Sequence, residues 1–146
     1  MKAINYLGQI KVMDARINAD IEELAQLEAL AAKTTSVMGG ERVQASGSQQ
    51  KMEDCVVKIV GMKEQINREI EEFINYKKEA RQILSGCSED CITILHKRYF
   101  QFKTWEQIAV DMNFTYKWVS GGLHQRALSQ FQRVMDERKH DKKENE

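Results

Sequence analysis

The chain has 146 residues, 42% of them hydrophobic and 30% charged, and it contains no proline. Average usage would give roughly seven prolines, and each costs about 3 kcal/mol inside a helix, so the composition predicts an all-α protein and excludes all-β and collagen-like folds. The 22 basic and 22 acidic residues cancel, so any preference for a charged partner must come from a local cluster.

The first predicted element is an amphipathic helix within residues 1–33. Its apolar residues recur every three or four positions, at Ile10, Met13, Ile17, Ile21, Leu24, Leu27 and Ala31. Residues 34–50 interrupt this pattern with Gly39-Gly40 and with Ala45-Ser46-Gly47-Ser48. Polar and glycine-rich composition of this kind predicts a flexible linker.

Residues 51–85 carry the most regular pattern in the chain and predict a long coiled-coil helix. Seam positions alternate in steps of four and three, at Met52, Val56, Ile59, Lys63, Ile66, Ile70, Phe73, Lys77, Ala80 and Leu84. A helix of this length needs a cover for its apolar stripe. Either the first helix folds back to form an antiparallel hairpin, or a second chain supplies the partner and the protein is a homo-oligomer.

Residues 86–139 predict a compact domain of three or four short helices. The first of these follows Gly86, a residue suited to a left-handed helix cap, and runs from about Glu89 to Phe100. A second helix begins at Thr104, which is followed three residues later by Gln107, the spacing of a capping box.

The spacing that follows is typical of a helix-turn-helix. Ala109 is a small residue in mid-helix, Asn113 tolerates positive φ at a turn, and Val119 can anchor the next helix, predicted from about Tyr116 to Lys139. The expected core of the motif consists of Trp105, Ile108, Ala109, Met112, Phe114, Val119 and Leu123. Residues 140–146 form a charged tail that should fray.

Three ordered motifs in this domain resemble a known family. They are Leu95-His96-Lys97-Arg98-Tyr99, Thr104-Trp105-Glu106-Gln107-Ile108-Ala109, and Val119 with Leu123-His124-Gln125-Arg126-Ala127-Leu128. Together they resemble region 4 of bacterial sigma factors, and most closely the small phage and prophage proteins of that type, the ArpU-like and RinA-like late transcription regulators. The resemblance covers about residues 88–135, and the coiled coil only by general layout.

This resemblance implies a regulator of transcription that places its last helix in the major groove of duplex DNA. It implies contacts near the bases from Thr115, Tyr116, Lys117, Ser120, Gly121 and His124. It implies phosphate contacts from Lys97, Arg98, Lys103, Arg126 and Arg133. Between His96 and Met135, six basic residues against two acidic ones leave a net charge of +4, so the neutral chain contains a basic module.

The last helix departs from the family pattern at one place. An apolar residue usually follows the valine by three positions, whereas Ser120-Gly121-Gly122 delays the leucine to position 123. The chain thus carries one additional residue, and two adjacent glycines favour a kink or a π-bulge there.

Two alternative functions fit the same residues. The first is a protein-interaction module that binds RNA polymerase or another regulator and has lost base reading. The second is a packaging factor similar to phage small terminase subunits, which also join a helix-turn-helix to helical oligomerisation segments.

The remaining motifs indicate neither an enzyme nor a cofactor. No P-loop or catalytic signature is present, and Cys87, Cys91 and His96 lack the second ligand pair that structural zinc normally needs. The N-terminal residues lack the unbroken apolar stretch of a signal peptide, and no apolar run approaches the roughly 20 residues of a membrane span. We therefore expect a cytoplasmic protein without a membrane partner, with its three cysteines reduced.

Overall fold

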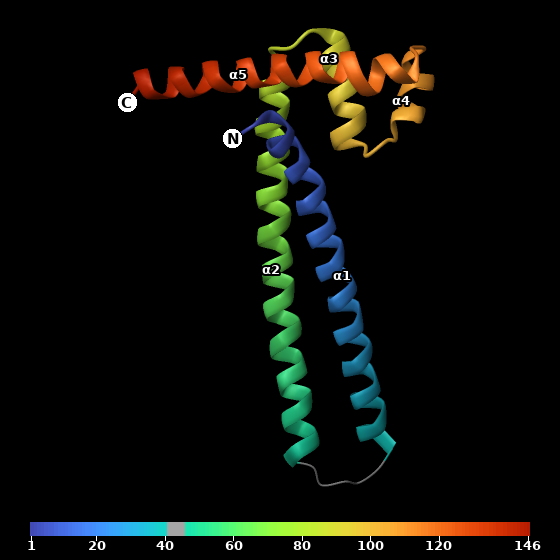
Figure 1. Cartoon of the computed structure of the whole chain (residues 1–146). Helices are drawn as coiled ribbons and strands as arrows, with labels where there is room; N and C mark the ends of the chain where they lie inside the picture. The colour runs from blue at the N-terminus through green and yellow to red at the C-terminus, as the bar shows by residue number, and fades with distance from the viewer. Residues whose placement is uncertain (41–45) are drawn as a thin grey trace. The chain divides into compact units, whose positions relative to one another are not determined.

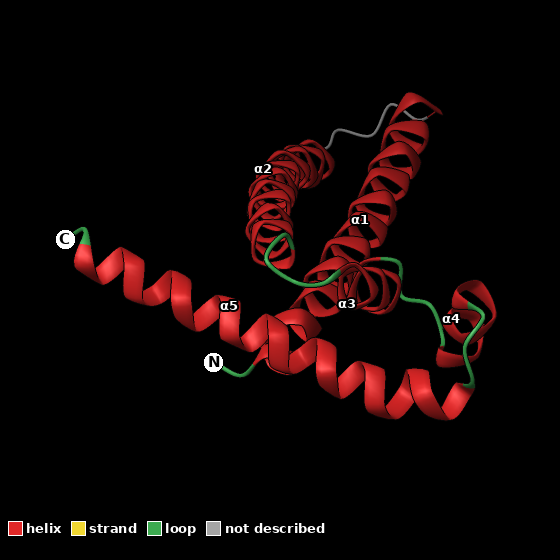
Figure 2. Cartoon of the chain, turned by 90° about the horizontal axis from the view of Figure 1, so that it is seen from above, coloured by secondary structure: helices red, strands yellow, loops and turns green. Residues whose placement is uncertain are grey.

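The computed structural model describes the backbone of residues 1–40 and 46–146, with side chains for residues 1–34 and 49–146. Every regular element in the described backbone is a helix (Figure 2), so the predicted all-α fold is confirmed. The first two helices, α1 (Ala3–Gly40) and α2 (Ser46–Leu84), form a long hairpin (Figure 1). None of the helices within the described ranges combines the length and the apolar character that crossing a bilayer requires.

Both long helices extend into residues 34–50, the predicted linker. Helix α1 continues to Gly40, and α2 already begins at Ser46. The linker prediction is therefore wrong for residues 34–40 and 46–50. The end of an apolar stripe does not end a helix, and each glycine costs a helix only about 1 kcal/mol. The rest of the predicted linker, residues 41–45, lies outside the described residues.

The helices divide between two compact units. The hairpin unit is Met13–Glu72, and the C-terminal unit combines Met1–Val12 with Phe73–Glu146. The sequence places the boundary of the C-terminal domain at residue 86, whereas the structure adds the beginning of α1 and the end of α2 to it. Their apolar residues belong to the core of that unit.

The seam of α2 in the hairpin unit departs from the predicted one at two positions and agrees with it at the others. Its buried or half-buried positions include Met52, Cys55, Ile59, Met62 and Ile66. The predicted seam positions Val56 and Lys63 are instead exposed, and the Nζ atom of Lys63 lies 3.6 Å from a carboxylate oxygen of Glu28. The predicted and the observed seam positions both alternate in steps of three and four. The sequence period alone therefore does not distinguish between them.

A pair of carboxyl groups lies inside the hairpin unit. Ile21, predicted to face the seam, is exposed, and Asp20 is half-buried in its place. One carboxyl oxygen of Asp20 and one of Glu69 are inaccessible to solvent. Burial raises the pKa of Glu69, and the carboxyl group of Asp20 raises it further. The surroundings of Glu69 in the hairpin therefore disfavour its charged form.

Four helices and two π-helical segments build the core of the C-terminal unit together with the start of α1. After α2 come α3 (Glu89–Leu95), the π-segment η1 (His96–Phe100), α4 (Trp105–Met112), the π-segment η2 (Trp118–Leu123) and α5 (His124–Glu144). The largest fully buried side chains are Leu7, Ile10, Cys91, Ile94, Leu95, Ile108, Val119, Leu123 and Phe131. The predicted fraying tail is helical as far as Glu144, because α5 continues without interruption.

Gly86, between α2 and α3, has a different role from the predicted one. No glycine in the described residues has positive φ, so Gly86 is not a left-handed cap. A Cβ atom at this position would lie 3.0 Å from both γ-methyl groups of Val134. The lack of a side chain at Gly86 therefore suits the close approach of α5, and the backbone conformation does not call for glycine.

Candidate functional site

Helix α4 begins with the capping box that the sequence predicts. The Thr104 hydroxyl oxygen accepts a hydrogen bond from the Gln107 backbone N–H at 3.2 Å. In return, the Gln107 side-chain oxygen accepts one from the Thr104 backbone N–H at 3.0 Å. These two bonds satisfy N–H groups that have no partner within the helix, and they fix where α4 starts.

A left-handed residue ends α4 and makes the turn. Asn113 has φ 58° and ψ 41°, and the next residue, Phe114, donates its N–H to the carbonyl oxygen of Ala109 at 3.0 Å. Ala109 is buried where α4 meets the following helix, together with Ile108, Val119 and Leu123. Trp105 and Met112 are partly buried against this core. These residues form the compact helix-turn-helix expected from their spacing.

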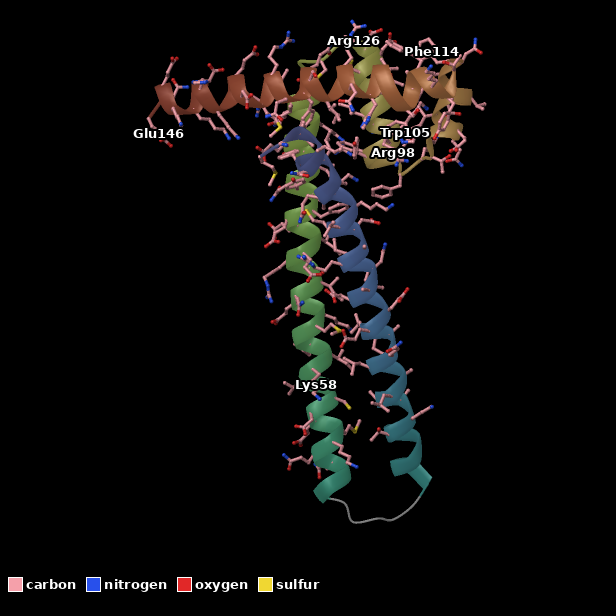
Figure 3. All side chains as sticks on the ribbon, viewed as in Figure 1. Lys58, Arg98, Trp105, Phe114, Arg126 and Glu146 are labelled. Carbon is pink, nitrogen blue, oxygen red and sulfur yellow. The ribbon has the colours of Figure 1, made fainter. Side chains whose placement is uncertain are left out.

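Phe114, which the sequence places in that core, is 40% exposed. The left-handed backbone at Asn113 redirects the chain, and the next side chain points to solvent (Figure 3). The apolar character of Phe114 therefore belongs to the surface of the turn.

The turn should tolerate glycine at position 113 and reject valine. Asn113→Val should lower the free energy of unfolding by about 1–2 kcal/mol, because a β-branched side chain collides with its own backbone in the left-handed region. Asn113→Gly should change it by only a few tenths of a kcal/mol, because glycine adopts positive φ without a steric penalty. Urea denaturation followed by circular dichroism measures both. Equal losses for the two variants would contradict a left-handed turn.

A continuous helix leads out of the turn. It starts at Tyr116, passes through η2 without a break and continues as α5 to Glu144. The additional residue recognised in the sequence is taken up by the π-segment, which is the distortion that two adjacent glycines favour. We call residues 116–135 of this continuous helix the recognition helix.

The π-segment keeps the buried side of the recognition helix in register. The core residues Val119, Leu123, Ala127 and Phe131 are spaced by four, and all are buried. In a regular α-helix each step of four turns about 40° beyond a full circle, so three steps would rotate the last residue well away from the first. The wider π-turn absorbs part of this rotation, and all four side chains reach one core.

The predicted DNA-contacting residues differ in exposure. Those fully on the surface are Thr115, Tyr116, Lys117, Arg126 and Arg133. Ser120 and Gly121 are half-exposed, and the Ser120 hydroxyl donates to the carbonyl oxygen of Tyr116 at 2.8 Å. Arg133 lies 3.8 Å from Glu137 across one helical turn, an exposed pair that contributes little energy.

The recognition helix carries no acidic residue. Between Asn113 and Met135 the chain has three basic residues, Lys117, Arg126 and Arg133, and neither aspartate nor glutamate. Because all three are exposed, this helix presents a positive surface even though the whole chain is neutral.

The other three predicted phosphate contacts are engaged within the protein. Lys97 and Lys103 lie 3.4 and 2.7 Å from one carboxylate oxygen of Asp111, and the hydrogen bond from Lys103 holds the pKa of Asp111 below its ordinary value. The Arg98 guanidinium lies 4.4 Å from the Trp105 ring centre (Figure 3) and donates to the Lys103 carbonyl oxygen. Lys97, Arg98 and Lys103 are therefore less available for contacts with phosphate than the cations of the recognition helix.

One protein-family model matches residues 32–121, and its description reads "Protein of unknown function (DUF1492)". The chain belongs to the DUF1492 family. The matched segment extends from the end of α1 through α2 and α4 as far as Gly121 in η2. Comparisons with curated proteins and with solved structures found no match. The family description names no activity for DUF1492 chains.

His124, expected on the DNA-facing side, is buried in the DUF1492 chain. Its Nε2 atom lies 2.7 Å from the Tyr99 hydroxyl, and its ring packs edge-on against Trp105 with ring centres 4.6 Å apart. Burial lowers its pKa, and the nearby Arg98 lowers it further. After the π-segment, His124 lies on the core side of the helix next to Leu123. The His124 ring therefore packs beneath the recognition helix and does not point outward.

Acidification should destabilise the C-terminal unit through His124. Because its folded-state pKa is lowered, the unfolded chain takes up this proton first as the pH falls. The stability from the neutral imidazole is therefore present above the ordinary histidine pKa of 6.5 and is lost progressively below it. The pKa of His96 is also lowered, chiefly by burial, and acts in the same sense.

Urea unfolding at about pH 7.5 and about pH 5 measures this dependence. His124→Gln keeps a hydrogen-bonding side chain but cannot titrate, so it should lose less stability on acidification than the parent. Comparing these two proteins cancels the contribution of the Glu69 carboxyl, which has the opposite sign because its pKa is raised. Equal losses would show that His124 does not titrate differently in the folded state.

Two of the thiols of the DUF1492 chain lie in the C-terminal unit, one buried and one half-buried. Cys91 is fully buried, and the Sγ atom of Cys87 lies 3.9 Å from the carbonyl oxygen of Ile83. Burial raises the pKa of Cys87. Across the described part of the chain, no three His, Cys, Asp or Glu side chains gather closely enough to hold a metal ion.

One pair of residues on the recognition helix was missed by the predicted contacts. A Cβ atom on Gly122 would overlap ring carbons Cζ3 and Cε3 of Trp118, whereas one on Gly121 would meet nothing within 4 Å. The indole of Trp118 therefore lies across Gly122. The spacing of four between an aromatic residue and a glycine could have indicated this contact, because such positions are neighbours on a helix surface.

Proposed function

We propose that this DUF1492 chain binds duplex DNA through its recognition helix and regulates transcription in a phage or prophage setting. The observation that carries the proposal is the exposed, acid-free and positively charged face of a continuous helix that follows a left-handed turn. A helix of this kind fits the major groove, where side chains near its N-terminus contact base edges.

In this proposal the residues divide by role. Thr115 immediately precedes the recognition helix, Tyr116 and Lys117 begin it, and all three contact bases. Arg126 and Arg133, further along it, contact phosphates and fix the orientation of the helix. Lys97 and Lys103 contribute less, because they share the carboxylate of Asp111.

Binding to a mixed-sequence duplex over a series of salt concentrations tests the proposal. The three exposed cations bound along the duplex, Lys117, Arg126 and Arg133, predict that log K falls with log[salt] with a slope of about −3. Fluorescence anisotropy of a labelled duplex measures the slope. A flat salt response, or no binding at low salt, would remove the support for DNA recognition.

We also propose that the chain self-associates through residues 51–85 with a second copy of itself. Val56, Val57 and Val60 lie exposed together on α2, with Val57 71% exposed, and helix-turn-helix proteins often read two half-sites as dimers. Light scattering should give a dimer for the parent and a monomer for Val57→Lys/Val60→Lys. A monomeric parent would contradict this, and a ring-sized mass would favour a packaging factor.

A specific observation favours a second candidate function, a protein-interaction module. Val110 at the end of α4 is 80% exposed and Phe114 in the turn is exposed as well, which gives the turn an apolar surface. In this case the turn docks on RNA polymerase or another regulator. Co-migration with purified RNA polymerase, lost in Val110→Asp and accompanied by no affinity for duplex DNA, would favour this candidate over the first.

A further inference from the structure

Gly122 has no backbone reason to be glycine. It lies in a helix, no described glycine has positive φ, and a glycine in a helix costs about 1 kcal/mol relative to alanine. The reason lies in its neighbour, because any Cβ atom at position 122 would overlap the indole of Trp118. Gly121, one residue earlier, meets no such neighbour and provides the contrast.

The indole of Trp118 is held on the surface and is not buried in the core. Its neighbour Val119 faces the core and is fully buried, whereas Trp118 remains 42% exposed. The ring lies against the glycine backbone on one side, and part of its remaining surface faces solvent. An aromatic ring held in this way loses little conformational freedom when it binds a partner.

The surroundings of Trp118 indicate the chemistry of that partner. Lys117 is adjacent, Arg126 lies further along the same helix, and both are exposed, with no acidic residue between Asn113 and Met135. A flat apolar surface flanked by cations suits an anionic polymer that also offers apolar groups. In the major groove of DNA, the apolar group accessible to a side chain is the 5-methyl of thymine.

We propose that Trp118 is a specificity-determining residue that contacts a thymine methyl group in the major groove, and that Gly122 is glycine so that the indole can lie in the position for this contact. This inference rests on the proposed DNA-binding function and adds a base preference to it. The role differs from that of Lys117 and Arg126, which contribute affinity through charge.

Three variants distinguish the effect of removing the Trp118 indole from the effect of moving it. Trp118→Ala removes the indole, Gly122→Ala displaces it without changing any charge, and Gly121→Ala is the matched control with open space around its new methyl group. The indole N–H resonances verify the geometry. The Trp118 signal should shift in Gly122→Ala and stay in place in Gly121→Ala. Circular dichroism verifies that each variant is folded.

The binding experiment uses a duplex that the parent enriches from a random-sequence pool. Each thymine in it is then replaced singly by deoxyuridine, which lacks only the 5-methyl group. We expect one position at which this replacement lowers the affinity of the parent protein for the duplex about fourfold. This is the effect expected for the burial of one methyl group. That dependence should disappear in both Trp118→Ala and Gly122→Ala.

The outcomes distinguish this inference from the function on which it rests. If the parent binds duplex DNA but no deoxyuridine position matters, or if Trp118→Ala keeps the same dependence, the role of Trp118 is overturned and DNA binding stands. If no duplex is bound at any salt concentration, both proposals are overturned.

Discussion

Phe131→Ala should lower the free energy of unfolding by about 3–5 kcal/mol. Phe131 is fully buried in α5, and its ring centre lies 5.7 Å from that of Tyr6 in the first turns of α1. It therefore joins segments that are far apart in the sequence. Removing the ring leaves a cavity at this junction, and since small proteins are stable by only about 5–15 kcal/mol, a large part of the stability should be lost.

The matched control for this prediction is Phe114→Ala. It removes the same ring from a position that is 40% exposed, so it should cost less than about 1 kcal/mol. Urea denaturation of both variants, followed by circular dichroism, gives the comparison. If the two substitutions cost the same, Phe131 does not have the buried environment described above.

Lys117→Ala/Arg126→Ala should weaken duplex binding on the order of a hundredfold. Each substitution removes one exposed cation from the acid-free face of the recognition helix. Two lost charge-assisted contacts at roughly 1.5 kcal/mol each amount to about 3 kcal/mol. Because each cation that binds the duplex releases counterions, the slope of log K against log[salt] should also become shallower by about 2. Fluorescence anisotropy at several salt concentrations measures both quantities.

The control for this variant removes the same number of charges elsewhere. Lys51 and Lys58 are exposed on α2 in the hairpin unit, and Lys51→Ala/Lys58→Ala should leave the affinity and the salt slope unchanged. Equal losses for the two double variants would mean that binding follows total charge and not the recognition helix.

The sequence predicts the helices and turns of this fold better than it predicts which face of each helix is buried. The capping box at Thr104, the small residue Ala109 and the left-handed turn at Asn113 were all predictable, because each depends on residues within one or two helical turns. The choice between Cys55 and Val56 for the α2 seam was not predictable. Both continue an alternation of three and four, whereas in the structure Cys55 is half-buried and Val56 is exposed.

The candidate site shows the same limit. The glycine pair predicted a local distortion, and the π-segment η2 is found there. The burial of His124 was not predictable, because it depends on how far the π-segment turns the helix before this residue. That residue contacts Tyr99 and Trp105 from other segments, and no local pattern indicates such a contact.

The π-segment also bears on how this chain tolerates changes in length. A helix that holds one surplus residue in η2 can release it and become a regular α-helix, with Val119 then three positions before the leucine instead of four. Deleting Gly121, whose surroundings are open, would therefore shorten the chain without moving the buried residues on either side out of the core. At this place the recognition helix can therefore lose one residue and still keep its apolar side in the core.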